Sequence, residues 1–195
     1  MIMNEEQHPW IVFPQLKTGK KLILGSFPPK RFTTEPQNLM KSDVDFFYGS
    51  VANEFWKMFC TSKGLDFDWR LNLEKLKSHL IANNWIVSDI ILKTTRRIDN
   101  ALDKDLLVTE WNIKIINELI ENNKIETIYF TSKWVQEKFC AKISPFLNKI
   151  PKTVILISPS KNGLMSLNWA REILKQLPNE NNKDYRQRYY NHFLI

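Results

Sequence analysis

The sequence predicts an α/β fold of three layers, in which helices cover both faces of a central, mostly parallel sheet of four strands. Short apolar runs alternate along the chain with longer segments whose apolar residues recur at helical spacing. Each run ends at glycine, proline or small polar residues, as buried strands do. This alternation is typical of parallel strands joined by helices that pack on both faces of the sheet.

The expected strands each contain a short apolar run, and they are residues 20–24, 85–92, 127–130 and 153–157. The first run, Leu22-Ile23-Leu24, stops abruptly at Gly25. The second strand is interrupted by Ser88-Asp89, and an unpaired acid inside an apolar strand is costly. We therefore expect Asp89 to have a hydrogen-bond partner.

The expected helices have apolar residues three and four positions apart, and they are residues 53–62, 71–82, 109–122, 133–143 and 166–177. We interpret residues 1–19 as an irregular N-terminal segment anchored by Trp10 and Phe13, with a lid as the alternative. Residues 184–195 form a basic, aromatic tail that we expect to pack against the sheet.

The totals predict one domain, residues 1–195, because 195 residues with 43% hydrophobic content are enough for a sizeable core. No apolar stretch approaches the ~20 residues that a membrane-spanning helix needs. The polar N-terminus is unlike a secretory signal, so we expect a cytoplasmic protein without a membrane partner. Cys60 and Cys140 are expected to be buried free thiols. The spacing of cysteines and histidines predicts no metal site, and we expect no cofactor.

Polar loops follow all four expected strands. Because the carboxyl ends of parallel strands meet at one edge of a sheet, the side chains of these loops should converge there. The loop residues are Gly25 and Ser26, residues 94–97, Thr131 and Ser132, and Ser158, Ser160, Lys161 and Asn162. Small hydroxyls and backbone N–H groups bind phosphates, and the net charge of +7 favours a polyanion. The loops therefore predict a phosphate-binding edge.

Several common catalytic patterns are absent from the sequence. It contains no P-loop, no dinucleotide-binding glycine pattern, no nucleophile elbow and no zinc signature. Ser26 is followed by Phe27-Pro28-Pro29, without the glycine of an elbow, so we do not expect it to attack a substrate. None of the three histidines lies near an expected strand end, which argues against a catalytic triad.

Aromatic residues surround a single amide between residues 46 and 56. Phe46-Phe47-Tyr48 precedes Asn53, and Phe55-Trp56 follows it. Asn53 stands at the start of an expected helix, so it is either the helix cap or a site residue that uses its donor and acceptor groups, and one residue can do both. We interpret residues 21–60 as a rigid pocket wall that faces an aromatic lid.

These segments resemble motifs of the uracil-DNA glycosylase superfamily. Its first motif, Gly-x-x-Pro-Gly directly after the first strand, is similar to Gly25-Ser26-Phe27-Pro28-Pro29, and its second, a Ser/Pro-rich loop after the last strand, is similar to residues 157–162. Within the superfamily, the mismatch-specific thymine/uracil and hypoxanthine-DNA glycosylase groups are the most similar. The segments that carry this likeness are Tyr48 to Trp56, which includes Asn53-Glu54-Phe55-Trp56, then Ser88-Asp89-Ile90, Arg96-Arg97 and residues 101–103. The resemblance spans residues 22–174.

The resemblance implies a monofunctional DNA glycosylase of base-excision repair that acts on DNA, either a duplex with a damaged or mismatched base or a single strand. We expect the protein to be a monomer. Such an enzyme hydrolyses the N-glycosidic bond of a flipped base, here uracil, hypoxanthine or a mismatched base. The implied catalytic candidates are Asn53, Asp89 and Asp45. The implied base pocket is Gly25, Ser26, Phe27, Pro28 and Tyr48. The implied DNA contacts are Arg96, Arg97, Ser158, Ser160, Lys161, Asn162 and Leu164, with Leu164 or Met165 as a wedge.

Two departures from the superfamily pattern leave alternatives open. Phe27 stands where the uracil and thymine enzymes place Asp or Asn, and residues 158–162 lack the histidine of the best-known branch. The first alternative is a catalytically degenerate member of the same fold that binds DNA without base excision. The second is a small-molecule α/β enzyme, which depends on fold analogy alone. As an alternative to packing on the sheet, the tail at residues 184–195 binds DNA.

Overall fold

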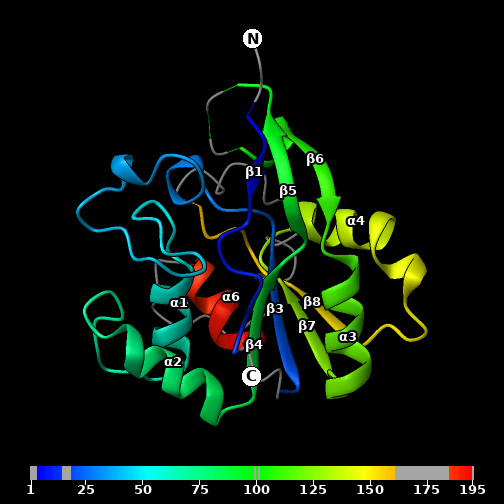
Figure 1. The fold of residues 1–195 in the computed structure, drawn as a ribbon. Coiled ribbons are helices and arrows are strands. Elements are labelled where there is room, and N and C mark those ends of the chain that lie inside the picture. The colour runs from blue at the N-terminus through cyan, green and yellow to red at the C-terminus, as the bar shows by residue number, and fades with distance from the viewer. Residues whose placement is uncertain (1–3, 15–18, 99, 101, 161–184, 195) are drawn as a thin grey trace.

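A mostly parallel sheet lies at the centre of the computed structural model, which describes residues 4–14, 19–98, 100, 102–160 and 185–194 (Figure 1). In pairing order, its described strands are β2 (Val12–Phe13), β4 (Trp85–Asp89), β3 (Lys21–Gly25), β7 (Thr127–Phe130) and β8 (Lys152–Ile155). Strand β2 is antiparallel to β4, whereas the other neighbours are parallel. The mostly parallel sheet is confirmed, but it has five described strands instead of four, because the N-terminal segment adds β2 at one edge.

A second, antiparallel sheet takes over part of the expected second strand. Its described strands are β1 (Glu6–Gln7), β5 (Ile91–Arg96) and β6 (Leu106–Trp111), with β5 in the middle. The prediction of one strand over residues 85–92 is therefore wrong, since β4 ends at Asp89 and β5 begins at Ile91 in the other sheet.

Backbone hydrogen bonds of Ile90 explain why the strand divides there. The Ile90 N–H donates to the Gly25 carbonyl oxygen (2.9 Å), and the Ile90 carbonyl oxygen accepts from the Asn112 N–H (2.9 Å). The Asn112 side-chain amide donates to Ser88 Oγ (3.1 Å) and to the Asp89 carbonyl oxygen (2.9 Å). The chain thus leaves the parallel sheet directly after Asp89, which places this acid at the sheet's C-terminal edge.

The helix expected over residues 109–122 begins later than predicted. Residues through Trp111 belong to β6, and helix α3 spans Ile113–Asn123. Pairing with β5, for example Thr94 opposite Val108, decides the conformation of residues whose apolar spacing alone is compatible with a helix. Tertiary contacts override local propensity at this point.

Helices cover both faces of the parallel sheet (Figure 1). On one face lie α1 (Phe55–Ser62), α2 (Leu73–Ala82) and α6 (Tyr185–Phe193), and on the other lie α3 and α4 (Lys133–Lys142). Successive residues of β3 point to opposite faces, so Ile23 packs in one core cluster with Trp56, whereas Leu22 and Leu24 pack in the other with Phe139. The three-layer arrangement is confirmed.

The C-terminal tail packs against the sheet, as expected. The Tyr189 and Tyr190 side chains are buried, and their hydroxyls donate to the carbonyl oxygens of Ile155 (2.8 Å) and Ile157 (2.9 Å). Arg186 forms an ion pair with Glu54 (2.7 Å) at the start of α1. The tail therefore supports the loop and helix that carry Asn53.

Three further expectations have different outcomes. Cys60 is a buried free thiol, but Cys140 is exposed, because it follows the buried Phe139 on the outward side of α4. The helix expected over residues 166–177 lies outside the described residues. Over the part of the chain that the structure describes, no helix is both long and apolar enough to span a membrane.

Candidate functional site

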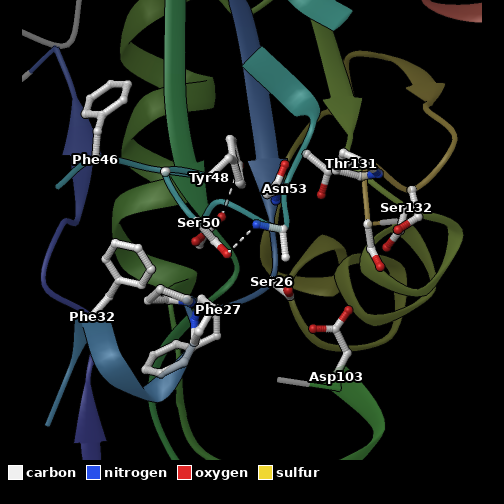
Figure 2. A pocket seen from close by; sticks show the side chains of 18 of the residues that line it. Ser26, Phe27, Phe32, Phe46, Tyr48, Ser50, Asn53, Asp103, Thr131 and Ser132 are labelled. Carbon is white, nitrogen blue, oxygen red and sulfur yellow. Dashed lines mark hydrogen bonds between the residues drawn. The ribbon is translucent and has the colours of Figure 1, made fainter. Parts of the chain in front are cut away.

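A pocket of about 190 Å³ opens where the parallel strands end (Figure 2). Loops after four strands line it: Ser26 after β3, Asp89 at the end of β4, Thr131 and Ser132 after β7, and Ser158 and Ser160 after β8. The aromatic segment adds Tyr48 and Asn53 to the same pocket. The structure thus brings together the loop after the first parallel strand, the amide and the Ser/Pro-rich loop.

Gly25 lets two side chains approach the backbone of β3. In the sheet register Gly25 lies opposite Asp89. A β-carbon at residue 25 would lie 2.5 Å from Asp89 Oδ1, 2.5 Å from Tyr48 Cε1 and 2.7 Å from the Tyr48 hydroxyl oxygen. These separations are too short for any side chain, so only glycine fits at this position while Asp89 and Tyr48 keep their places.

Asp89 is buried and hydrogen-bonded through both carboxylate oxygens, as its position in an apolar strand predicts. His8 Nε2 lies 2.7 Å from Oδ2, and the Tyr48 hydroxyl donates to Oδ1 (3.0 Å). The Trp10 N–H donates to His8 Nδ1 (3.1 Å), which assigns the ring proton to Nε2. The expectation that no histidine lies near a strand end is wrong, because β1 carries the N-terminal segment across the sheet edge to Asp89.

Tyr48 holds an uncommon backbone conformation at the pocket wall. Its φ is 55°, in the left-handed region that non-glycine residues adopt rarely. The hydroxyl also lies 3.2 Å from the Ser88 carbonyl oxygen, and the ring lies 4.9 Å from that of Phe55, centre to centre. Burial, followed by the negative charge of Asp89, raises the pKa of the Tyr48 hydroxyl well above its ordinary value. The tyrosine is therefore a fixed neutral donor.

Asn53 links the aromatic segment to the Ser/Pro-rich loop and also supports helix α1. Its backbone forms an isolated antiparallel bridge with Ser160. Its Oδ1 accepts the N–H of Phe55, the first residue of α1 (2.9 Å). The N-cap position itself is Glu54, whose side chain makes no capping bond, so Asn53 supports the start of the helix from one residue before the expected cap position. No residue that the structure describes accepts a hydrogen bond from Asn53 Nδ2, which leaves this donor to a ligand in the pocket.

Aromatic rings form one side of the pocket, on the side away from Thr131 and Ser132 (Figure 2). The lining rings are Trp10, Phe27, Phe32, Phe46 and Tyr48. The Phe27 ring stands edge-on to the His8 ring, with 5.3 Å between the ring centres, and the Trp10 ring packs against that of Phe32, with 5.7 Å between the centres. The N-terminal segment therefore contributes a pocket wall as well as an anchor, which its sequence alone does not reveal.

Two neighbouring arginines of the expected DNA contacts lie in different surroundings. The Arg96 side chain is buried and makes four hydrogen bonds, two to Glu6, one to the Pro28 carbonyl oxygen and one to the Asn100 carbonyl oxygen. Its guanidinium group holds the Pro28 loop in place. Arg97 is exposed at the end of β5 and stays a candidate for a phosphate contact.

The remaining predicted site residues divide into three groups. Pro28 lines the pocket. Asp45 is exposed and does not line it, which places this catalytic candidate away from the site. Lys161, Asn162 and Leu164, together with Met165, lie outside the described residues.

Asp103 is a pocket residue that sequence reasoning did not single out. It begins the short 3₁₀ helix Asp103–Asp105, between the two long strands of the antiparallel sheet, and its carboxyl group points into the pocket (Figure 2). Its pKa is raised from 3.8 to about 6, chiefly by burial, although a hydrogen bond from the Ser26 side chain lowers it. Asp89 raises the pKa further and Arg96 lowers it. The only sequence signal was its place at the end of the segment 101–103.

The raised pKa of Asp103 predicts a stability effect whose sign follows from proton linkage. A carboxyl group with a higher pKa in the folded state destabilises that state at pH values above about 6, and the penalty disappears as pH falls through 6 towards 3.8. Asp103→Asn should therefore raise the free energy of unfolding at pH 8 by about 1–2 kcal/mol, discounted because the carboxyl is partly open to solvent. Urea unfolding at pH 8 and pH 4 tests this, and an equal gain at both pH values would contradict it.

Comparison with known proteins identifies a shared fold. No family model and no curated protein sequence matches the chain. Among solved structures, the solution NMR structure of a "putative uracil DNA glycosylase" from Methanosarcina acetivorans is similar, with a TM-score of 0.57 and 17% sequence identity over 96% of each chain. The likeness covers nearly the whole of both chains and shows that the two proteins share an α/β fold.

Proposed function

We propose that the protein is a monofunctional DNA glycosylase, which hydrolyses the N-glycosidic bond of a deaminated or mismatched base after the nucleotide is flipped from the duplex. The observation that carries the proposal is that Asn53 and Ser158 to Ser160 line one pocket. The wall residues Asp89 and Tyr48 lie where Gly25 leaves room for them. The fold likeness to a protein described as a glycosylase supports it.

Several groups that line the pocket support this proposal. Aromatic rings, Phe27 and Tyr48 among them, offer stacking surface for a flipped base. Asn53 Nδ2 is free to donate to a base carbonyl, which stabilises negative charge that develops on the leaving base. Ser158 and Ser160 line the pocket in the loop after β8, and serine hydroxyls are suited to bind phosphate oxygens. The net charge of +7 favours association with DNA.

Base excision is tested with labelled duplexes that contain uracil, hypoxanthine or a G·T mismatch. Each duplex is incubated with excess protein and then treated with alkali, which breaks the strand only at an abasic site. The proposal expects cleavage at the modified position of at least one duplex and none in an undamaged control. Intact strands in all reactions would contradict it.

Two substitutions of Asn53 separate its support of helix α1 from its proposed role in base release. Asn53→Asp keeps the oxygen that accepts the Phe55 N–H but removes the Nδ2 donor, so we expect unchanged stability and a loss of base release of about 100-fold. Asn53→Ala loses both groups and should also lower the free energy of unfolding by about 1 kcal/mol. Single-turnover rates and urea unfolding give the two readouts. Base release by Asn53→Asp at the wild-type rate would show that the amide donor is not used.

One observation favours a second candidate, a protein that binds DNA at this pocket without cleaving the glycosidic bond. Phe27 fills the position where the similar uracil and thymine enzymes place a water-activating residue. This candidate expects tight, salt-sensitive binding to damaged duplexes without base release, and Asn53→Ala would then change the affinity little. Fluorescence anisotropy at several salt concentrations, beside the cleavage assay, distinguishes the two.

A further inference from the structure

Two carboxyl groups line the pocket, and their surroundings differ. Asp89 has both oxygens engaged, by His8 at 2.7 Å and by Tyr48 at 3.0 Å, and these bonds fix it as part of the wall. Asp103 has one described side-chain donor, Ser26. Its side chain is only partly buried, and the open part faces the pocket (Figure 2). One carboxylate thus has free acceptor capacity where a substrate would lie.

Charges around Asp103 come from several elements and partly balance one another. Asp89 on β4 repels its negative charge, and Arg96 on β5 attracts it, but Glu6 on β1 forms an ion pair with that arginine (2.7 Å). His8 and Tyr48 are bound to Asp89, so they face this acid instead of Asp103. The net environment leaves Asp103 ionised at neutral pH but easily protonated, which is the condition a proton acceptor in catalysis needs.

We propose that Asp103 is the catalytic base that activates water in this pocket, with Ser26 orienting its carboxylate. The inference depends on the proposed glycosylase function. It assigns the water-activating residue, which Phe27 cannot be. Because the acid comes from the loop before β6 instead of the loop after β3, the water-activating role would have moved to another element while the pocket stayed the same.

The proposed step balances in atoms and charge. The carboxylate of Asp103 accepts a proton from a water molecule as the water oxygen forms a bond to the anomeric carbon of the flipped nucleotide. The bond from that carbon to the base nitrogen breaks, and its electron pair stays on the base, where Asn53 Nδ2 can donate to it. A solvent proton then neutralises the base, and Asp103 returns its proton to solvent.

The first test compares Asp103→Asn with Asp66→Asn, which removes the same charge from an exposed loop outside the pocket. Asp103→Asn should lower the single-turnover rate of base release by about 100-fold to 10,000-fold, and Asp66→Asn should not change it. The wild-type rate should fall about tenfold per pH unit below pH 6, where the pKa of Asp103 lies, and this dependence should be missing in Asp103→Asn. Equal rates and pH profiles for wild type and Asp103→Asn would overturn the inference and leave the proposed function standing.

A second test does not need a known target base. A duplex with a cationic pyrrolidine in place of one deoxyribose mimics the positive charge at the anomeric carbon, and a tetrahydrofuran duplex is its neutral match. Wild type and Asp66→Asn should bind the cationic duplex about tenfold more tightly, and Asp103→Asn should bind both alike. If that pattern appears but no base is ever released, Asp103 faces the anomeric position of bound DNA, but both the proposed function and the catalytic role of Asp103 are wrong. If wild type shows no preference, or Asp103→Asn keeps it, the inference is overturned.

Discussion

Gly25→Ala should lower the free energy of unfolding by about 3 kcal/mol and reduce base release by about 100-fold. The added β-carbon would meet Asp89 Oδ1 and the Tyr48 ring, both at 2.5 Å. Neither group can move cheaply, because Asp89 is bound to His8 and Tyr48 is bound to Asp89. The pocket wall must therefore distort together with the network that holds it.

Gly64→Ala is the matched control for this substitution. A β-carbon at residue 64 meets nothing within 4 Å, but its φ of 64° disfavours alanine. We expect a loss of about 1 kcal/mol without any change in base release. Urea unfolding and single-turnover rates for both variants separate the effect on the pocket from a general loss of stability. Wild-type activity in Gly25→Ala would contradict the close approach of these side chains.

Asp89→Ala should lower the free energy of unfolding by about 3 kcal/mol, because it leaves two buried donors without their acceptor. The His8 Nε2–H and the Tyr48 hydroxyl both lose a carboxylate partner, at 2.7 Å and 3.0 Å. Without the Asp89 carboxylate, the N-terminal segment loses the hydrogen bond that joins His8 to the edge of the sheet. Trp10 and Tyr48 then no longer keep a fixed place in the pocket wall, so base release should also fall.

Asp89→Asn is the informative comparison for the same site. Its oxygen can accept from His8, its amide can donate to the Tyr48 oxygen, and the Tyr48 hydroxyl can turn to the Ser88 carbonyl oxygen at 3.2 Å. We expect a loss of only about 1 kcal/mol and substantial remaining activity. If Asp89→Asn abolishes base release while its stability stays close to that of wild type, Asp89 itself is the catalytic acid or base and the assignment of Asp103 is wrong.

Features set by short stretches of sequence could be predicted. The apolar run before Gly25 and the runs at residues 127–130 and 153–157 give three of the parallel strands to within a residue or two at each end. Their polar loops meet at one edge because parallel strands must end together. The contact of Asn53 with the start of α1 also follows from local geometry, since an amide just before a helix can accept an N–H of its first turn, although the cap position is Glu54.

Features that depend on distant contacts could not be predicted. The split at Ile90 needs partners at Gly25 and Asn112, which no local pattern announces. His8 stands 81 residues from Asp89, in a segment whose two short strands lack any recognisable periodicity. Asp103 enters the pocket because a short 3₁₀ helix lies between β5 and β6, and no local sequence pattern distinguishes it from the other acids of the chain. Asp45 has the same residue type and is nearer to Asn53 in sequence, yet it is exposed outside the pocket.

The most direct measurement is mass spectrometry of the free base that wild-type protein releases from duplexes that contain uracil, hypoxanthine or a G·T mismatch, with Gly25→Ala in parallel. We expect one free base for every abasic strand formed by the wild type, and almost none from Gly25→Ala. This expectation is contradicted if wild-type protein, in excess over each duplex, leaves every base attached to its sugar.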